Sequence, residues 1–189
     1  MILQEYLCGL RDAVIARGLV NEFHPYVEMI QRDGLTFPAE YIGQGDYKQV
    51  QNFDVGGSGY VRKRGSVPFS TSEVASFTAC EDDNSINEIT YPLRMVLGVP
   101  RTALGDNAFA DDVLMYEMYS IVGTTYSVTN VQDVSVNLRS FDTDSLSIWP
   151  SEVRGFDYQM HFRLAYIAID FDVVFTVSKD CLKQECYGS

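Results

Sequence analysis

Alternation of apolar and polar residues with period two is strongest in the segment 162–178. Between its apolar positions lie Ala168, Asp170, Asp172, Val174 and Thr176. Successive side chains of a strand point to opposite faces of a sheet, so the pattern predicts a long strand with one buried face and one face in water. Strands are typically about five or six residues long, so the excess length predicts a sheet that lines a surface larger than one subunit. The buried face is predicted to carry Ile167, Ile169, Phe171, Val173, Phe175 and Val177.

A second segment, 88–100, has the same period and a similar length. We expect the two long strands to pair or to lie close together in one sheet. Shorter strands are predicted at 24–30 and 36–42, joined by a turn over 32–34, and at 128–138. The predicted buried positions of the segment 88–100 are Ile89, Tyr91, Leu93, Met95, Leu97 and Val99.

Two other segments have helical spacing. An apolar stripe through Leu3, Leu7, Leu10 and Val14 predicts an N-terminal helix that ends near Gly18. A second helix is predicted to begin after Asp106 or Asn107 and to end at Gly123, with Leu114, Met118, Ile121 and Val122 on its buried side. The segment 140–155 is interpreted as a polar connection.

The order of these elements predicts an α+β fold, in which two helices pack on one face of a mainly antiparallel sheet. The chain has 189 residues and no long linker. A single domain over residues 1–189 is therefore expected.

Glycine is concentrated between residues 43 and 72. We interpret this part as a long glycine-rich hairpin, an arm extending from the sheet with a mobile tip at 54–59. The only basic cluster of the chain, Arg62–Arg64, follows the tip. Three interpretations of the cluster stay open: an exposed arm without a partner, an arm that reaches an acidic surface of a neighbouring subunit or partner, and contact with DNA. The second interpretation assigns subunit or partner contacts to Val55, Gly56, Gly57, Gly59, Tyr60, Arg62, Lys63 and Arg64.

The chain is strongly acidic, with a formal net charge of -12 from 26 acidic and 14 basic residues. General binding to nucleic acid or to anionic membranes is disfavoured, because both need a positive surface. The charge is explained either by solubility or by an acidic face along a passage through which DNA slides without sticking. The sequence also predicts no membrane span, since it has no apolar run of 18 residues.

Motifs for catalysis, metals or cofactors are not evident. The glycines at 56–59 are not followed by Lys-Ser or Lys-Thr, which argues against a phosphate loop. The four cysteines show no CxxC spacing and only two histidines are present, which argues against zinc. Asp170 and Asp172 either hold a cation, flank a hydrolytic site or lie on a solvated sheet face. We therefore predict no cofactor, no metal and no enzymatic activity.

Three segments carry a resemblance to a known group of proteins. They are MILQEYLCGLRDAV at 1–14, YIGQGDYKQVQNFDVGGSGYVRKRGSV at 41–67 and AYIAIDFDVVFTV at 165–177. The chain resembles small neck or ring proteins of tailed bacteriophages, especially those of the crAss-like group. Its element order is similar to the tail-terminator type of domain, in which two helices pack on a sheet and a long hairpin extends from it.

The resemblance implies a virion structural protein, assembled in the host cytoplasm, that forms a homo-oligomeric ring in the head–tail neck or tail. Such a ring joins portal to tail and passes genomic DNA through its lumen. The implied partners are further copies of the chain and the portal or adjacent ring proteins, with DNA only as passing cargo. Two other classes stay open: a soluble tail-assembly chaperone or binding module, and a carboxylate-based hydrolase centred on Asp170 and Asp172.

Overall fold

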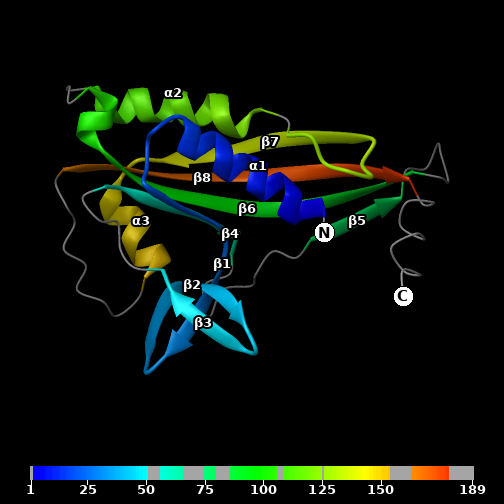
Figure 1. The fold of residues 1–189 in the computed structure, drawn as a ribbon, viewed down its shortest axis with the longest axis horizontal. Helices are drawn as coiled ribbons and strands as arrows, with labels where there is room; N and C mark the ends of the chain where they lie inside the picture. Colours follow the sequence, from blue (N-terminus) through cyan, green and yellow to red (C-terminus); the bar gives the residue numbers. More distant parts are fainter. Residues whose placement is uncertain are drawn as a thin grey trace.

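The computed structural model describes residues 2–50, 56–65, 75–79, 86–105, 109–124, 126–153 and 163–178. These residues form an eight-stranded sheet with helices on both faces (Figure 1). The elements in chain order are α1 (Ile2–Ala16), β1 (Glu22–Arg32), β2 (Leu35–Gly43), β3 (Asp46–Gln49), β4 (Ser58–Lys63), β5 (Ser76–Ala79), β6 (Ile86–Pro100), the 3-10 helix η1 (Arg101–Leu104), α2 (Ala110–Val122), β7 (Asp133–Asp142), α3 (Ser145–Glu152) and β8 (Leu164–Ser178).

The two long strands form the centre of the sheet. β6 and β8 pair antiparallel along their whole length, from Ile86 opposite Ser178 to Pro100 opposite Leu164. The strand order is β3-β2-β1-β4-β6-β8-β7, and β5 pairs with β6 beside this path. Among the described pairs only β1 and β4 run parallel. The predicted α+β fold with a mainly antiparallel sheet is therefore confirmed.

The main core lies between this sheet and the helices α1 and α2, which cover the same face (Figure 1). α1 ends before Gly18, whose φ of 67° favours glycine. The predicted buried positions of both long strands face this core, so the period-two pattern is confirmed on this side. Fully buried members include Tyr6, Leu10, Leu93, Met95, Leu97, Leu114, Met118, Ile167, Ile169, Phe171, Val173 and Phe175.

The opposite face of the sheet carries α3 and a smaller apolar cluster. The cluster combines Ile148 of α3 and Val153 with residues from the strands below. The segment 140–155 is predicted to be a polar connection, and that prediction is wrong for residues 140–142, which continue β7, and for residues 145–152, which form α3. A helix of only two turns that contains Pro150 has no apolar stripe long enough to be recognised. The strand residues of the cluster are Val27, Tyr60, Val96, Leu164, Tyr166 and Ala168.

Strands β1, β2 and β3 form a projection that stands away from the main sheet (Figure 1). The first part of β1, from Glu22 to Val27, pairs with β4. Its last part, from Glu28 to Arg32, pairs with β2 instead. One strand thus belongs to both the main sheet and the projection.

The prediction of a glycine-rich hairpin at 43–72 is wrong. β3 and β4 are not partners: β3 pairs with β2, whereas β4 lies between β1 and β6 inside the sheet. Gly57 has φ 74°, and a Cβ there would lie 2.7 Å from the carbonyl oxygen of Gly98. A Cβ on Gly59 would lie 2.9 Å from the side chain of Leu97. These glycines therefore allow β4 to approach β6 closely; they do not mark a free tip.

Candidate functional site

The residues predicted to contact other subunits lie largely inside the molecule. Tyr60 and Arg62 are 1% and 2% exposed, Gly57 and Gly59 are buried, and Gly56, Lys63 and Arg64 are half-buried. Val55 lies outside the described residues. The prediction of an exposed arm is wrong for Tyr60 and Arg62, because β4 is a central strand with neighbours on both edges.

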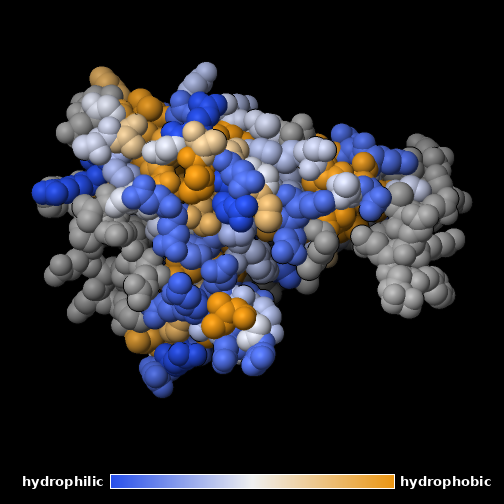
Figure 2. Space-filling model, in the orientation of Figure 1, coloured by the Kyte–Doolittle hydropathy of each residue, from blue (hydrophilic) through white to orange (hydrophobic). Residues whose placement is uncertain are grey.

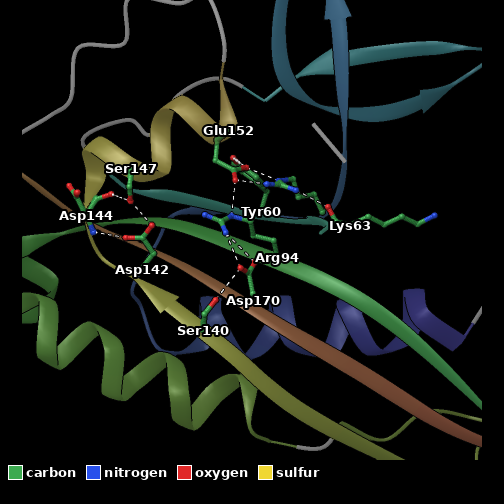
Figure 3. Close-up of polar contacts among 10 residues, drawn as sticks. Tyr60, Lys63, Arg94, Ser140, Asp142, Asp144, Ser147, Glu152 and Asp170 are labelled. Atoms are coloured by element: carbon green, nitrogen blue, oxygen red, sulfur yellow. Dashed lines mark hydrogen bonds and ion pairs between the residues drawn. The ribbon is translucent and has the colours of Figure 1, made fainter. Parts of the chain in front are cut away.

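Arg62 is bonded to Glu152, the last residue of α3. The carboxylate of Glu152 also lies beside Tyr60 (Figure 3). Arg62 Nε donates to Glu152 Oε2 at 2.7 Å and Arg62 Nη2 donates to Oε1 at 2.6 Å. The hydroxyl of Tyr60 donates to the same Oε2 at 2.8 Å. Glu152 is fully buried, so this pair is an internal ion pair with two parallel hydrogen bonds.

Arg94 extends the pair into a network across the sheet. Its Nε lies 2.8 Å from Glu152 Oε1, and its Nη1 donates to both oxygens of Asp170 at 3.0 and 3.2 Å. The hydroxyl of Ser140 donates to Asp170 at 3.1 Å. The strand register explains why these side chains lie in one row across the sheet. Arg62 lies opposite Arg94, Arg94 opposite Asp170, and Asp170 opposite Ser140. We call Tyr60, Arg62, Arg94, Ser140, Glu152 and Asp170 the Glu152 network.

A second ion-pair cluster lies one step further along the same face. Asp172 is only 3% exposed and contacts Arg64 Nη2 at 3.0 Å. Arg139 Nε donates to its other carboxylate oxygen at 2.7 Å. The expectation of a solvated face is therefore wrong for Asp172, since its carboxylate is buried and paired with the guanidinium groups of Arg64 and Arg139.

The network changes the acidity of its members. Burial raises the pKa of Glu152, but hydrogen bonds from Arg62 and the positive charges of Arg62 and Arg94 outweigh burial and hold its pKa below the usual value. Burial, reinforced by the negative charge of Glu152, raises the pKa of Tyr60 well above its usual value. Glu152 is thus a stable anion and Tyr60 a stable donor.

Glu152 itself is poorly suited to act as a catalytic acid. That role needs a carboxyl group with a raised pKa, whereas the pKa of Glu152 is lowered. Within the described ranges, no three His, Cys, Asp or Glu side chains are grouped to hold a metal ion. His24 is buried and contacts Glu22 and Glu40, while His161 lies outside the described residues.

The start of α3 is fixed by a separate set of hydrogen bonds (Figure 3). Asp144 precedes the helix and its Oδ1 accepts from the backbone N–H of Leu146 at 2.9 Å, which makes it the N-cap. Asp142, the last residue of β7, accepts from the N–H of Asp144 at 2.9 Å and from the hydroxyl of Ser147. α3 is therefore joined to β7 at its first turn and to the Glu152 network at its last residue.

Two groups of large apolar side chains are exposed. The first, which we call the α2 surface, consists of Phe109, Met115, Tyr116 and Tyr119, exposed by 67%, 40%, 74% and 58%. The second, which we call the projection tip, consists of the exposed Tyr41 and Ile42 and the half-buried Tyr47 beside them. Tyr41 and Ile42 are 56% and 62% exposed, and the rings of Tyr41 and Tyr47 are 5.3 Å apart.

Comparison with known proteins gives no family: no protein-family model matches the chain, and no curated protein matches it significantly. Among the described helices, none combines the length and the apolar character needed to cross a membrane.

Sequence reasoning missed two sets of functional candidates. The α2 surface had a signal, because Tyr116 and Tyr119 fall opposite the predicted buried side of the helix at Leu114 and Met118. No signal in the sequence points to Glu152, because its partners on β4 and β6 are distant in sequence and the pattern does not predict its helix.

Proposed function

We propose that this protein is a virion structural protein of a tailed bacteriophage that forms a homo-oligomeric ring in the neck or tail. In this role it joins the portal to the tail and passes genomic DNA through the ring. The observation that carries the proposal is the presence of two unlike apolar surfaces on opposite sides of one subunit.

The α2 surface lies on the outer side of the helical layer, and the projection tip lies beyond the other side of the sheet (Figure 1). Figure 2 shows apolar side chains at the surface over the helical layer and again at the end of the projection. A subunit with two different, separated contact surfaces associates head to tail, and head-to-tail association closes into a ring when the rotation permits. Exposed Tyr and Phe are typical of such interfaces.

Two further observations support the bacteriophage neck in particular. The three segments quoted above resemble small neck or ring proteins of tailed phages. The net charge of -12 would let DNA slide through a lumen without binding, since like charges repel. Portal and adjacent ring proteins are the partners that this role requires.

Light scattering after size-exclusion chromatography tests the proposal. A mass of about six or twelve subunits is expected for a ring matched to a portal, and electron microscopy of the same fraction is expected to show annular particles. A monomer that stays monomeric at high concentration would overturn the ring and favour the tail-assembly chaperone.

A further inference from the structure

In the Glu152 network, two guanidinium groups and one hydroxyl surround a single carboxylate, and all three belong to the sheet. Tyr60 and Arg62 lie on β4 and Arg94 lies on β6, whereas the carboxylate comes from α3. The three side chains make four contacts with Glu152, at 2.6, 2.7, 2.8 and 2.8 Å. The planar fork of Arg62 matches the two oxygens of a carboxylate group.

The two arginine donors have contacts that do not involve α3. Arg62 Nη1 donates to the backbone carbonyl of Lys63 at 2.8 Å. Arg94 is bonded to Asp170, which Ser140 holds in turn. Without Glu152, two guanidinium groups would face the single carboxylate of Asp170, so a preformed site with an excess of positive charge would remain.

Of the two apolar side chains of α3 that the structure describes, one is buried against the sheet and one is exposed. Ile148 and the adjoining Val153 are buried, but Leu146 is 70% exposed. The first turn is tied to β7 through Asp142 and Asp144. Among the described contacts, α3 is thus held at its start by hydrogen bonds to Asp142 and Asp144 and at its end by the bonds of Glu152.

We propose that Tyr60, Arg62 and Arg94 form a carboxylate-binding site, which Glu152 occupies from within the chain. The site accepts a carboxylate side chain of a partner protein when α3 moves away. Glu152 is an internal stand-in for that ligand, and exchange of one carboxylate for the other couples partner binding to the position of α3. This inference is independent of the ring function.

Chemical rescue of Glu152→Ala tests the site, with sodium acetate as the probe. The midpoint of thermal unfolding is expected to rise with acetate concentration, and at 100 times the dissociation constant the ratio of folded to unfolded protein rises about 100-fold. Sodium chloride at equal concentration and the neutral analogue acetamide are expected to give no such rise. Equal effects of acetate and chloride would overturn the proposal.

Two variants serve as controls for the rescue. Glu117→Ala also removes a helical glutamate paired with an arginine, at 2.8 Å from Arg17, but on an exposed helix; acetate should not stabilise it more than chloride does. Glu152→Ala/Arg62→Met removes both charges of the buried pair, so this double variant should be as insensitive to acetate as Glu117→Ala. Specific stabilisation of either control by acetate would contradict the assignment.

Glu152→Gln provides a second route that does not depend on the folding of Glu152→Ala. Its amide still accepts from one donor but forms a weaker contact, so acetate is expected to displace the side chain. Hydrogen exchange of the backbone amides in α3 should then accelerate in acetate relative to chloride, while exchange in β6 and β8 does not. Unchanged exchange in α3 would overturn the displacement of the helix.

Discussion

Arg62 is a charged residue in a central strand, and its neighbours explain how it is accommodated there. Its side chain is 3% exposed and that of Glu152 is fully buried. A buried ion pair offsets the cost of desolvation only when both partners keep their hydrogen bonds. Both do so here, since Tyr60 and the carbonyl of Lys63 complete the set.

Arg62→Met is expected to lower the free energy of unfolding by about 3–5 kcal/mol, the range for breaking one side of a buried ion pair. Urea denaturation followed by circular dichroism measures the loss. Arg11→Met is the matched control, because Arg11 pairs with Asp12 at the surface, where ion pairs contribute about 0–1 kcal/mol. Similar losses in the two variants would contradict the internal role of Arg62.

Tyr6 and Tyr126 provide a second comparison between single residues. Their rings are 5.4 Å apart. The Tyr126 hydroxyl donates to the carbonyl of Ile121 at 2.8 Å, whereas the fully buried Tyr6 hydroxyl has no hydrogen-bond partner in the part of the chain that the structure describes. Burial raises the pKa of the Tyr6 hydroxyl, as expected for a group removed from water.

Removing the two hydroxyl groups should therefore have different effects. Tyr126→Phe is expected to lower the free energy of unfolding by about 0.5–1.5 kcal/mol, and Tyr6→Phe to leave it unchanged or raise it. Thermal and urea unfolding of both variants measure the difference. A loss in Tyr6→Phe as large as that in Tyr126→Phe would show that the Tyr6 hydroxyl is satisfied.

At the level of elements, α3 depends on one titratable group at its end. Because the pKa of Glu152 is lower in the folded chain than its ordinary value of 4.5, the charged pair stabilises the fold above that value. The stabilisation is lost as the pH falls through the lowered pKa, when Glu152 becomes protonated.

Acidification below about pH 4.5 is therefore expected to weaken the wild type more steeply than Glu152→Gln, which has no charge to lose. The measurement is the free energy of unfolding against pH for both proteins, from which the difference isolates Glu152. Parallel curves would show that its carboxylate does not titrate in this window.

The elements also differ in how far the sequence predicts them. β6, β8, α1 and α2 repeat their apolar period over 13 to 15 residues, and a repeated period identifies both the element and its buried face. β4 has only six residues, and the glycines before and within it are typical of a turn. Its neighbours β1 and β6 are remote in sequence. Its central place is decided by tertiary pairing, which no local pattern records.

For the whole molecule, the sequence pattern predicted a contact surface on residues that the structure places largely in the interior. The basic charge of Arg62 suggests an exposed side chain, whereas the structure buries it; the exposed apolar side chains include those of the α2 surface and the projection tip. The carboxylate of Glu152 pairs with Arg62 inside the molecule. The charge pattern around Arg62 in the sequence does not reveal this distant partner.

Head-to-tail association makes a specific prediction for mixtures. Ile42→Glu blocks the projection tip and Tyr116→Glu blocks the α2 surface, so each variant alone should be monomeric. Mixed in equal amounts, they should form a heterodimer and nothing larger, because one intact surface of each kind remains. Light scattering after chromatography gives the masses.

Gln4→Glu is the matched control for added charge, since Gln4 is an exposed residue of α1 outside both surfaces. This variant should assemble like the wild type. Dimers of Ile42→Glu alone would instead indicate that two α2 surfaces pair with each other, which contradicts a ring built head to tail.

The continuity of β1 links the projection to the interior of the main sheet. Its distal half carries β2, where Tyr41 and Ile42 reach outward, and its proximal half runs along β4 beside Tyr60, with a change of register between His24 and Val27. A force that tilts the projection tip would be transmitted along the backbone of β1. Because β1 pairs with β4, the strand that bears Arg62, such a force would reach the site where Glu152 is bound.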